Sequence, residues 1–550
     1  MTTIDTHATG AVGTVGDPAA TAGTSSAVAL SGVAGWITTT DHKRIGRMFI
    51  GGSLAAALGV AVLGILLALD RASTSTSVLG AKSVAQVFAA YQVGAIYIVL
   101  VPLLLGLALA VTPLQLGARS LAFPRLAAIG FWAWLFGAAL VVGSIAANGG
   151  PGGGDRRMVA GFIVAHIVLL VGLFAAAVSL AATVFTTRAP GMNMRRIPPF
   201  SFAALVGALG VILAVPVLVG ALVYSFVDYK YGGAGFGNSK ELLGHLGFGF
   251  TQPLTFAFAV PAFGVAIEAV AIASGKRLPM RGTIFAGFGL IGIGVLGAVI
   301  QVPAGIRKNV TDVSFGTALN DIVPYALVQL LPILGALTVL GVGGLALSKG
   351  RPKVSAALVF GLLGSLMVFV GILANAIYQI GDAQLGGTVF EEGTRLYVVY
   401  GALLASLGAV AHWGPKLWGR TMPNKAVIPL ALLGFLGTVL AALPLLIAGF
   451  AKQQANSMVL EESGPKELWN VLSMVGHALV ALTVLAFVGL AFKSFTGSGT
   501  EGAAGDDPWD GQTLEWATSS PAPVANFAEI HSITSAEPLF DLKHSAERTA

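Results

Sequence analysis

The sequence contains no cysteine and few charged residues. Without a thiol, disulfide bonds, thiolate nucleophiles and cysteine-ligated metal centres are excluded. Only 10% of the 550 residues are charged and 55% are apolar, which excludes a soluble domain. Residues 1–34 are rich in Ala, Thr and Gly and lack the apolar core of a cleaved signal peptide, so we expect this segment to be disordered.

Long apolar runs dominate the rest of the chain. Runs of about 20 apolar residues are typical of helices that cross a lipid bilayer. The sequence therefore predicts an all-α integral membrane protein, a bundle of twelve transmembrane helices within residues 35–495. The predicted spans are 48–69, 84–112, 127–147, 158–186, 202–227, 246–273, 283–303, 322–348, 355–379, 396–413, 427–450 and 470–493.

Charge is distributed unevenly between the two sides of the predicted bundle. The N-terminal segment and the loops after even-numbered spans hold 17 Lys and Arg, whereas the loops after odd-numbered spans hold 11. Loops that join helices on the even side carry no Asp or Glu, and those on the odd side carry 12. Because basic loops stay in the cytoplasm, both termini are expected inside. The net charge of +6 therefore reflects topology and does not indicate nucleic-acid binding.

Several long motifs have a distinctive order. The stretch His245–Gly264 reads HLGFGFTQPLTFAFAVPAFG, Trp36–Gly46 reads WITTTDHKRIG, and Thr186–Phe200 reads TTRAPGMNMRRIPPF. Near the C-terminus, Pro508–Phe527 reads PWDGQTLEWATSSPAPVANF. These motifs resemble those of subunit I of the haem-copper oxidases, the cytochrome c oxidase family, and the resemblance runs from Trp36 to about Asp541. It implies the twelve-helix subunit I fold in an aerobic respiratory chain.

The resemblance also identifies positions where the family has metal ligands. The low-spin haem ligands of the family fall on Tyr91 and Ala402, and the high-spin haem ligand falls on Tyr400. One copper ligand falls on Gln252, and the helix that carries the other two corresponds to Leu296–Gly305, which has no histidine. A different alignment of the tenth span also finds no histidine. Haem iron and this type of copper need strong axial ligands and imidazoles.

Other functional positions of the family are changed as well. At the position of the family's proton-carrying glutamate this sequence has Leu254, and at the position of the family's cross-linked tyrosine it has Phe256. Ser120 stands where the family has the aspartate at the entrance of a proton pathway, and Leu109 stands where the family has an asparagine of the same pathway. The arginine pair that clamps the haem propionates falls in Gly449–Gln453, where a single Lys452 replaces the rigid guanidinium forks.

Four ionisable groups remain as candidates. His42 lies in the cytoplasmic entry to the first span, where a structural role is favoured. His166 and His477 lie inside spans; a buried, neutral histidine that bonds across helices is the favoured interpretation, although intramembrane ionisable groups are functional candidates. Glu268 is the only carboxylate well inside a predicted span, at a position where the family also has glutamate.

Three functions are compatible with these observations. The favoured one is a haem-less and copper-less structural or accessory subunit, with no catalytic residue, that joins subunit II- or III-like proteins in a bacterial plasma membrane. The second is an active oxidase with haem on Tyr91 or Tyr400, although a phenolate is costly in a low dielectric. No Lys or Arg stands within a turn of Tyr91, and Arg395 is the only cation near Tyr400. The third, a transporter or channel that reuses the bundle, requires paired intramembrane charges or broken helices lined with polar groups.

Loss of two haems leaves a volume to be filled. Either the helices close together, or lipid or quinone fills the gap, because empty cavities are costly. After a Gly-rich linker at 496–507, the cytoplasmic tail 508–550 has no apolar span. We expect this tail to pack on the cytoplasmic loops of its own bundle or on a neighbouring subunit.

Overall fold

The computed structural model describes most of the chain beyond residue 31. The described residues are 32–72, 78–151, 153–231, 257–300, 319, 322–350, 352–455, 465–497, 503–529 and 533–549. Residues 1–39 form one unit, within which the structure describes a short helix, α1 (Val33–Ile37). Residues 40–550 form the second unit, to which everything below refers. Of residues 1–34, which we expect to be disordered, residues 1–31 lie outside the described part, whereas Val33 and Ala34 begin α1.

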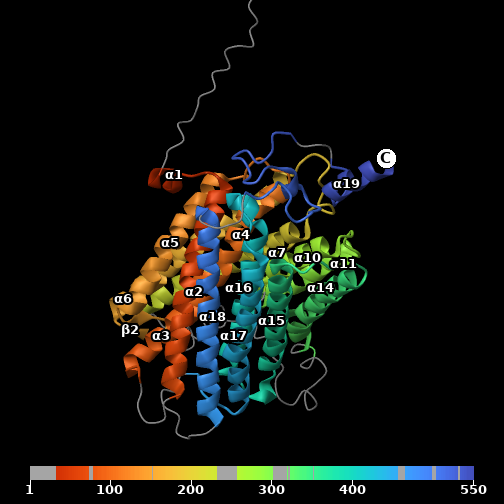
Figure 1. Cartoon of the computed structure of the whole chain (residues 1–550). Coiled ribbons are helices and arrows are strands. Elements are labelled where there is room, and N and C mark those ends of the chain that lie inside the picture. Colours follow the sequence, from red (N-terminus) through yellow and green to blue (C-terminus); the bar gives the residue numbers. More distant parts are fainter. Residues whose placement is uncertain are drawn as a thin grey trace, which may run out of the picture. The chain divides into compact units, whose positions relative to one another are not determined.

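The second unit is a bundle of apolar helices (Figure 1), as the sequence predicts. Within the described ranges, ten helical stretches are long and apolar enough to cross a membrane. They are α2 (His42–Ala72), Ser83–Gln115, α5 (Pro124–Ala146), α6 (Arg156–Thr186), α7 (Pro199–Tyr231), Ile322–Ser348, α15 (Ala356–Tyr378), α16 (Phe390–Trp418), α17 (Asn424–Phe450) and α18 (Pro465–Thr496).

The sixth and seventh predicted spans are described only in part. Their described portions are the apolar helices α10 (Val260–Ser274), α11 (Arg281–Gly292) and α12 (Val295–Ile300). The remainder of both spans lies outside the described residues, and Gln252, Leu254 and Phe256 lie there too. The all-helical membrane bundle is confirmed, with ten spans complete and parts of two more.

Two of the spans contain π-helical segments. The second span consists of α3 (Ala81–Val93), the π-helix η1 (Gly94–Leu100) and α4 (Val101–Gln115). The eighth span has the π-helix η3 (Ala326–Leu330) before α14 (Leu331–Ser348). A π-helical turn widens the backbone and is frequent at functional sites. Smaller elements complete the described chain: the strands β1 (Gly149–Gly150) and β2 (Gly153–Gly154), the 3-10 helices η4 (Gly381–Ala383) and η5 (Leu514–Ala517), and α19 (Pro538–Thr549).

Side chains at the helix starts and small residues at the crossings fix the bundle. The carboxylate of Asp155 accepts hydrogen bonds from the backbone N–H groups of Arg157 and Met158 and so caps α6. Where α5 crosses α6, a Cβ on Gly130 would lie 2.7 Å from the backbone oxygen of Gly172. Only glycine allows this approach, which gives the close helix packing expected of a membrane bundle.

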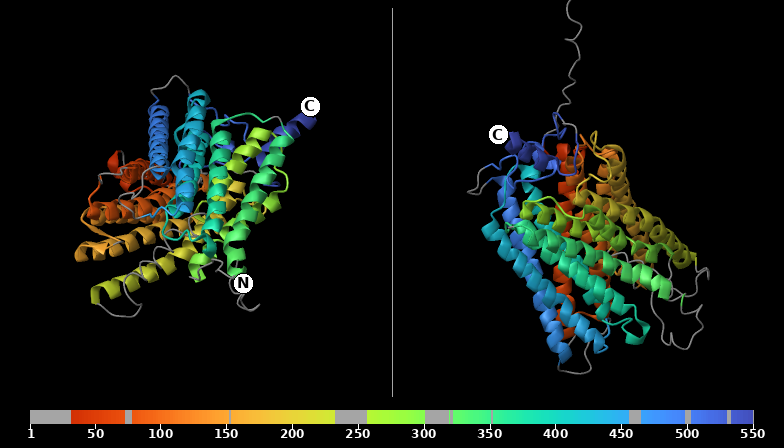
Figure 2. Two further views of the ribbon diagram at one scale, coloured as in Figure 1. Left: turned by 90° about the horizontal axis from the view of Figure 1, so that it is seen from below. Right: turned by 90° about the vertical axis from the view of Figure 1, so that its right-hand side faces the viewer.

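The second span and α16 are the most enclosed helices, and their apolar windows are fully buried by other helices. α18 packs against both α17 and α2, and α16 packs between α15 and α17. The C-terminal segment lies across one end of these helices (Figures 1 and 2). The two tyrosines at the haem-ligand positions, Tyr91 in α3 and Tyr400 in α16, therefore lie in the interior of the bundle.

Candidate functional site

A cluster of three aromatic rings joins the haem-ligand positions that the family resemblance implies. The phenol oxygen of Tyr400 and Nδ1 of His477 in α18 lie 2.7 Å apart, within hydrogen-bond distance. The His477 ring also meets the rings of Tyr91 and Tyr400 edge to face, with centroids 5.8 Å and 5.7 Å apart. All three side chains are at most 1% exposed. We call Tyr91, Tyr400 and His477 the aromatic cluster; it confirms the cross-helix hydrogen bond expected for His477.

A glycine on α2 makes room for the aromatic cluster. A Cβ on Gly64 would lie 2.6 Å from Nδ1 and Cε1 of His477, which is closer than real Cβ contacts. The imidazole therefore lies directly against the α2 backbone. Ala402, the second low-spin position, is fully buried, and its carbonyl accepts a hydrogen bond from the Ser406 hydroxyl at 2.8 Å.

These residues do not fit a haem. The imidazole of His477 fills the space between Tyr91 and Tyr400, and a porphyrin bound to either phenol would compete for that volume. Ala402 offers no ligand atom, and the phenol of Tyr400 is already paired with His477. Of these positions only Tyr91 has an oxygen without a described partner, and a neutral phenol is a weak ligand for iron.

A second cluster, of charged side chains, lies next to the aromatic cluster. Nη2 of Arg71 in α2 donates to Oε2 of Glu392 in α16 at 2.8 Å and to the carbonyl of Ala455 at 3.0 Å. The side chains of Arg71 and Glu392 are only 4% and 3% exposed. The guanidinium carbon of Arg395 lies 5.7 Å from the centroid of the Tyr91 ring. We call Arg71, Glu392 and Arg395 the charged cluster.

The charged cluster adds to two sequence-based expectations. No cation stands within a turn of Tyr91 along its own helix, and the cation over the Tyr91 ring is Arg395 from α16. Glu268 is the only carboxylate well inside a predicted span, and α16 begins at Phe390, six residues before the predicted start, so that it buries Glu392 in its first turn. Hydropathy placed the boundary too late because charged residues lower the average, whereas the Arg71 ion pair compensates Glu392 inside the protein.

The propionate-clamp position has a local structural role. Gln453 and Asn470 exchange two amide hydrogen bonds of 3.1 Å and 3.2 Å and are both buried. Nζ of Lys452 donates to the carbonyls of Ala383 and Gln384 at 2.5 Å and 3.0 Å. At this position the side chains of Lys452 and Gln453 therefore bond to the loop carbonyls and to Asn470.

The copper position can be described only in part. Gln252 and residues 301–305 lie outside the described residues, so their geometry stays a prediction. In the described part of the chain, no group of three or more His, Asp or Glu side chains is arranged to hold a metal ion.

His166 and His42 make contacts that are typical of structural residues. The His166 ring meets the Tyr97 ring edge to face, with centroids 4.9 Å apart. Nε2 of His42 lies 3.0 Å from Oδ1 of Asn526 in the tail, and Nδ1 lies 3.1 Å from the carbonyl oxygen of Leu109. Ser120, at the former pathway entrance, donates only to the carbonyl of its neighbour Leu121. His42 thus anchors the tail, in agreement with its predicted structural role.

The tail packs on the bundle itself, which is one of the two expected arrangements. Asn526 accepts from Nζ of Lys43 at 3.0 Å and donates to the carbonyl of Ala118 at 2.8 Å. Lys416 at the end of α16 donates to the carbonyls of Asp506 and Thr518. The tail therefore contacts α2, the end of α4 and α16 at one end of the bundle (Figure 1).

The tail also contributes to a buried network of carboxyl groups. Nε2 of Gln115 donates to Oε1 of Glu268 at 2.8 Å and to Oε1 of Glu515 at 3.0 Å. The Ser201 hydroxyl donates to Oε1 of Gln115 at 2.7 Å, and Nε1 of Trp413 donates to Glu515 at 3.3 Å. Burial raises the pKa of Glu515, which is fully enclosed. The glutamate shared with the family thus fastens the tail through Gln115.

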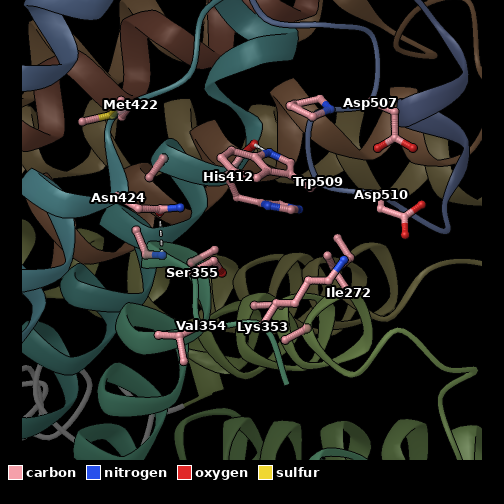
Figure 3. Close-up of a pocket in the computed structure, with 16 residues that line it drawn as sticks. Ile272, Lys353, Val354, Ser355, His412, Met422, Asn424, Asp507, Trp509 and Asp510 are labelled. Atoms are coloured by element: carbon pink, nitrogen blue, oxygen red, sulfur yellow. Dashed lines mark hydrogen bonds between the residues drawn. The ribbon is translucent and has the colours of Figure 1, made fainter. Parts of the chain in front are cut away.

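Two cavities lie away from the aromatic cluster. One, of about 350 Å³, lies between the tail and the ends of α10, α15 and α16 (Figure 3), and His412, Trp509, Asn424 and Lys353 line it. The other, of about 860 Å³, is an apolar groove between α2, α3, η1 and α5, with Gln86 at its polar part. Neither cavity is lined by Tyr91, Tyr400 or His477.

Comparison with known proteins gives a consistent result. Residues 44–479 match the family described as cytochrome c and quinol oxidase polypeptide I. A putative cytochrome c oxidase subunit 1-beta of Streptomyces coelicolor is 29% identical over 92% of this chain and 90% of its own length. The cytochrome c oxidase subunit 1 of Corynebacterium diphtheriae is 29% identical, with 94% of each chain covered. That of Bacillus subtilis is 26% identical over 94% of this chain and 84% of its own length.

Proposed function

This chain belongs to the cytochrome c and quinol oxidase polypeptide I family, and from that premise we propose that it is a haem-less and copper-less accessory subunit of a respiratory membrane complex. It is a subunit I-like integral membrane protein, because both the family match and the ten apolar helices agree on this point. The proposal concerns what the bundle does without its redox centres: it supports other subunits and transfers no electrons.

The observation that carries the proposal is the aromatic cluster. In an oxidase the interior between these helices must hold a porphyrin, whereas here side chains from α3, α16 and α18 fill it and bond to one another. The close contact of His477 with Gly64 makes the filling tight. Protein interiors tolerate few voids, so a bundle that lost its cofactors is stable only if its own side chains close the gap.

The changed family positions support the same reading. Loss of one ligand could be offset by a substitute, but here the positions have new partners. Tyr400 bonds to His477, Gln453 bonds to Asn470, and Lys452 bonds to two loop carbonyls. Each of these contacts stabilises the fold and leaves the side chain unavailable for a haem or its carboxylates.

The transporter alternative receives limited support. The Arg71–Glu392 pair is a buried ion pair of the type that this alternative requires. However, Arg71 is the second-last residue of α2, and Glu392 is the third residue of α16. The pair therefore joins two helix ends, which suits a structural clamp better than a transport site in mid-membrane.

The surfaces that remain suit an accessory subunit. The apolar groove beside α2 and α5 has the lining that a lipid acyl chain needs, and lipid is a predicted partner. The resemblance to subunit I implies subunit II- or III-like partners in a bacterial plasma membrane. A tagged chain extracted from its own membranes in mild detergent should co-purify with such a subunit at a fixed ratio. Recovery of the chain alone, under conditions that keep an intact oxidase assembled, would contradict the accessory role.

A further inference from the structure

Arg395 is the one member of the charged cluster whose guanidinium has no hydrogen-bond partner in the described residues. Its side chain is 2% exposed, and Nε, Nη1 and Nη2 are all buried without an acceptor there. The phenol oxygen of Tyr91, the residue over which Arg395 lies, is likewise buried without a described partner. The guanidinium of Arg395 and the hydroxyl of Tyr91 can therefore both donate hydrogen bonds to a third group.

The neighbouring carboxylates do not satisfy Arg395. Glu392 is bonded to Arg71 at 2.8 Å, and Glu391 accepts a hydrogen bond from the Tyr378 hydroxyl at 3.0 Å. No salt bridge joins Arg395 to either glutamate among the described residues. Because Glu392 is paired with Arg71, Arg395 has no carboxylate in ion-pair contact among the described residues.

The charge of Arg395 cannot be removed by proton loss, because a guanidinium stays protonated in proteins. An unpaired ion in a protein interior is strongly destabilising even after relaxation. The Tyr91 ring, over which the guanidinium lies, offsets only part of that destabilisation. The Arg395 N–H groups would still lack acceptors.

We propose that Arg395 and Tyr91 form a binding site for a compact monovalent anion, with chloride or a small carboxylate such as formate as the chemical class. A monovalent anion supplies the ion-pair partner that Arg395 lacks among the described residues, and the planar guanidinium fork suits a halide or a carboxylate. The anion must be small, because Arg395 and Tyr91 are only 2% and 0% exposed. This inference rests on the proposed function, since without haem no haem carboxylate is present to pair with Arg395.

Bromide replaces chloride and can be located directly by its anomalous scattering. Crystals of the full chain soaked in sodium bromide should show an anomalous peak within hydrogen-bond distance of the Arg395 guanidinium. A water molecule at that place, with no anomalous peak, would overturn the anion site and leave the haem-less proposal intact. A haem carboxylate at that place would overturn both.

Thermal unfolding in detergent gives an independent test with variants. At equal ionic strength, chloride in place of gluconate should raise the unfolding midpoint of the wild-type protein in a saturable manner. The variant Arg395→Met should lose this shift, and Arg395→Lys should keep part of it because the charge remains. In the control Lys452→Met, which removes a cation outside the charged cluster, the chloride shift should persist. An equal chloride shift in Arg395→Met would rule out the site.

Discussion

The phenol oxygen of Tyr400 and Nδ1 of His477 lie 2.7 Å apart in the interior of the bundle, and together they close the space between α16 and α18. The family resemblance implies a haem ligand at the Tyr400 position. Here that position supplies a hydrogen bond between two helices instead. A position at which the family resemblance implies a ligand thus contributes to packing in this protein, and the consequences can be measured.

The contact between Gly64 and His477 should behave as a coupled pair. Gly64→Ala places a methyl group against the imidazole, and overpacking of this kind costs about 1–3 kcal/mol. In the double variant Gly64→Ala/His477→Ala the clash is absent, so the two single effects should not add. Thermal unfolding of the four proteins gives the coupling directly. Additive losses would show that His477 does not fill the space beside α2.

Loss of the Tyr400 hydroxyl should have a smaller effect. Tyr400→Phe keeps the ring in the aromatic cluster and removes only the hydrogen bond to His477. The expected loss of unfolding free energy is about 0.5–1.5 kcal/mol, because the unfolded state inside a membrane also finds partners for polar groups. A loss as large as that of His477→Ala would mean that the hydroxyl does more than bond to one imidazole.

Tail docking should weaken as the pH rises. Burial raises the pKa of Glu515 in the folded protein, so the folded state holds a proton that the unfolded tail has already lost. The stability due to this proton is complete below the unfolded pKa and is lost as the pH rises through the folded pKa. Protease cleavage of the tail should therefore be faster at about pH 8 than at about pH 5.

A matched pair of substitutions isolates Glu515 in that experiment. Glu515→Gln should flatten the pH dependence of cleavage, because an amide has no proton to lose. Glu529→Gln changes an exposed glutamate of the same tail and should leave the dependence unchanged. Burial also raises the pKa of Glu537, so Glu537 should account for the pH dependence of cleavage that remains in Glu515→Gln. Equal slopes in all three proteins would argue against a role for the buried carboxyl.

The topology makes a further prediction. The basic even-side loops predict that both termini lie in the cytoplasm, and the even number of predicted spans agrees with this. Reporter proteins fused after residue 497 and at the N-terminus should both report a cytoplasmic position. An external C-terminus together with a cytoplasmic N-terminus would require an odd number of spans and would overturn the twelve-helix assignment.

The fold could be predicted from the sequence to a greater extent than the site. Apolar runs give the positions of the spans because membrane insertion depends on local composition. The start of α16 at Phe390 could not be predicted, because Glu392 and Arg395 are buried only through Arg71 and Tyr91 on other helices. Likewise, the contact of His477 with Tyr400 depends on the rotation of two helices relative to each other. The sequence predicts that the family's ligands are absent, whereas the side chains that fill their place could not be predicted from it.

The most direct test of the haem-less proposal is an optical one. The chain, purified free of other oxidase subunits, is examined by a reduced-minus-oxidised spectrum together with metal analysis for iron and copper. We predict no Soret band, less than stoichiometric iron and copper, and no reduction of oxygen. Stoichiometric haem with a Soret band that follows the protein through purification would contradict the proposal and would favour haem ligation by Tyr91 or Tyr400.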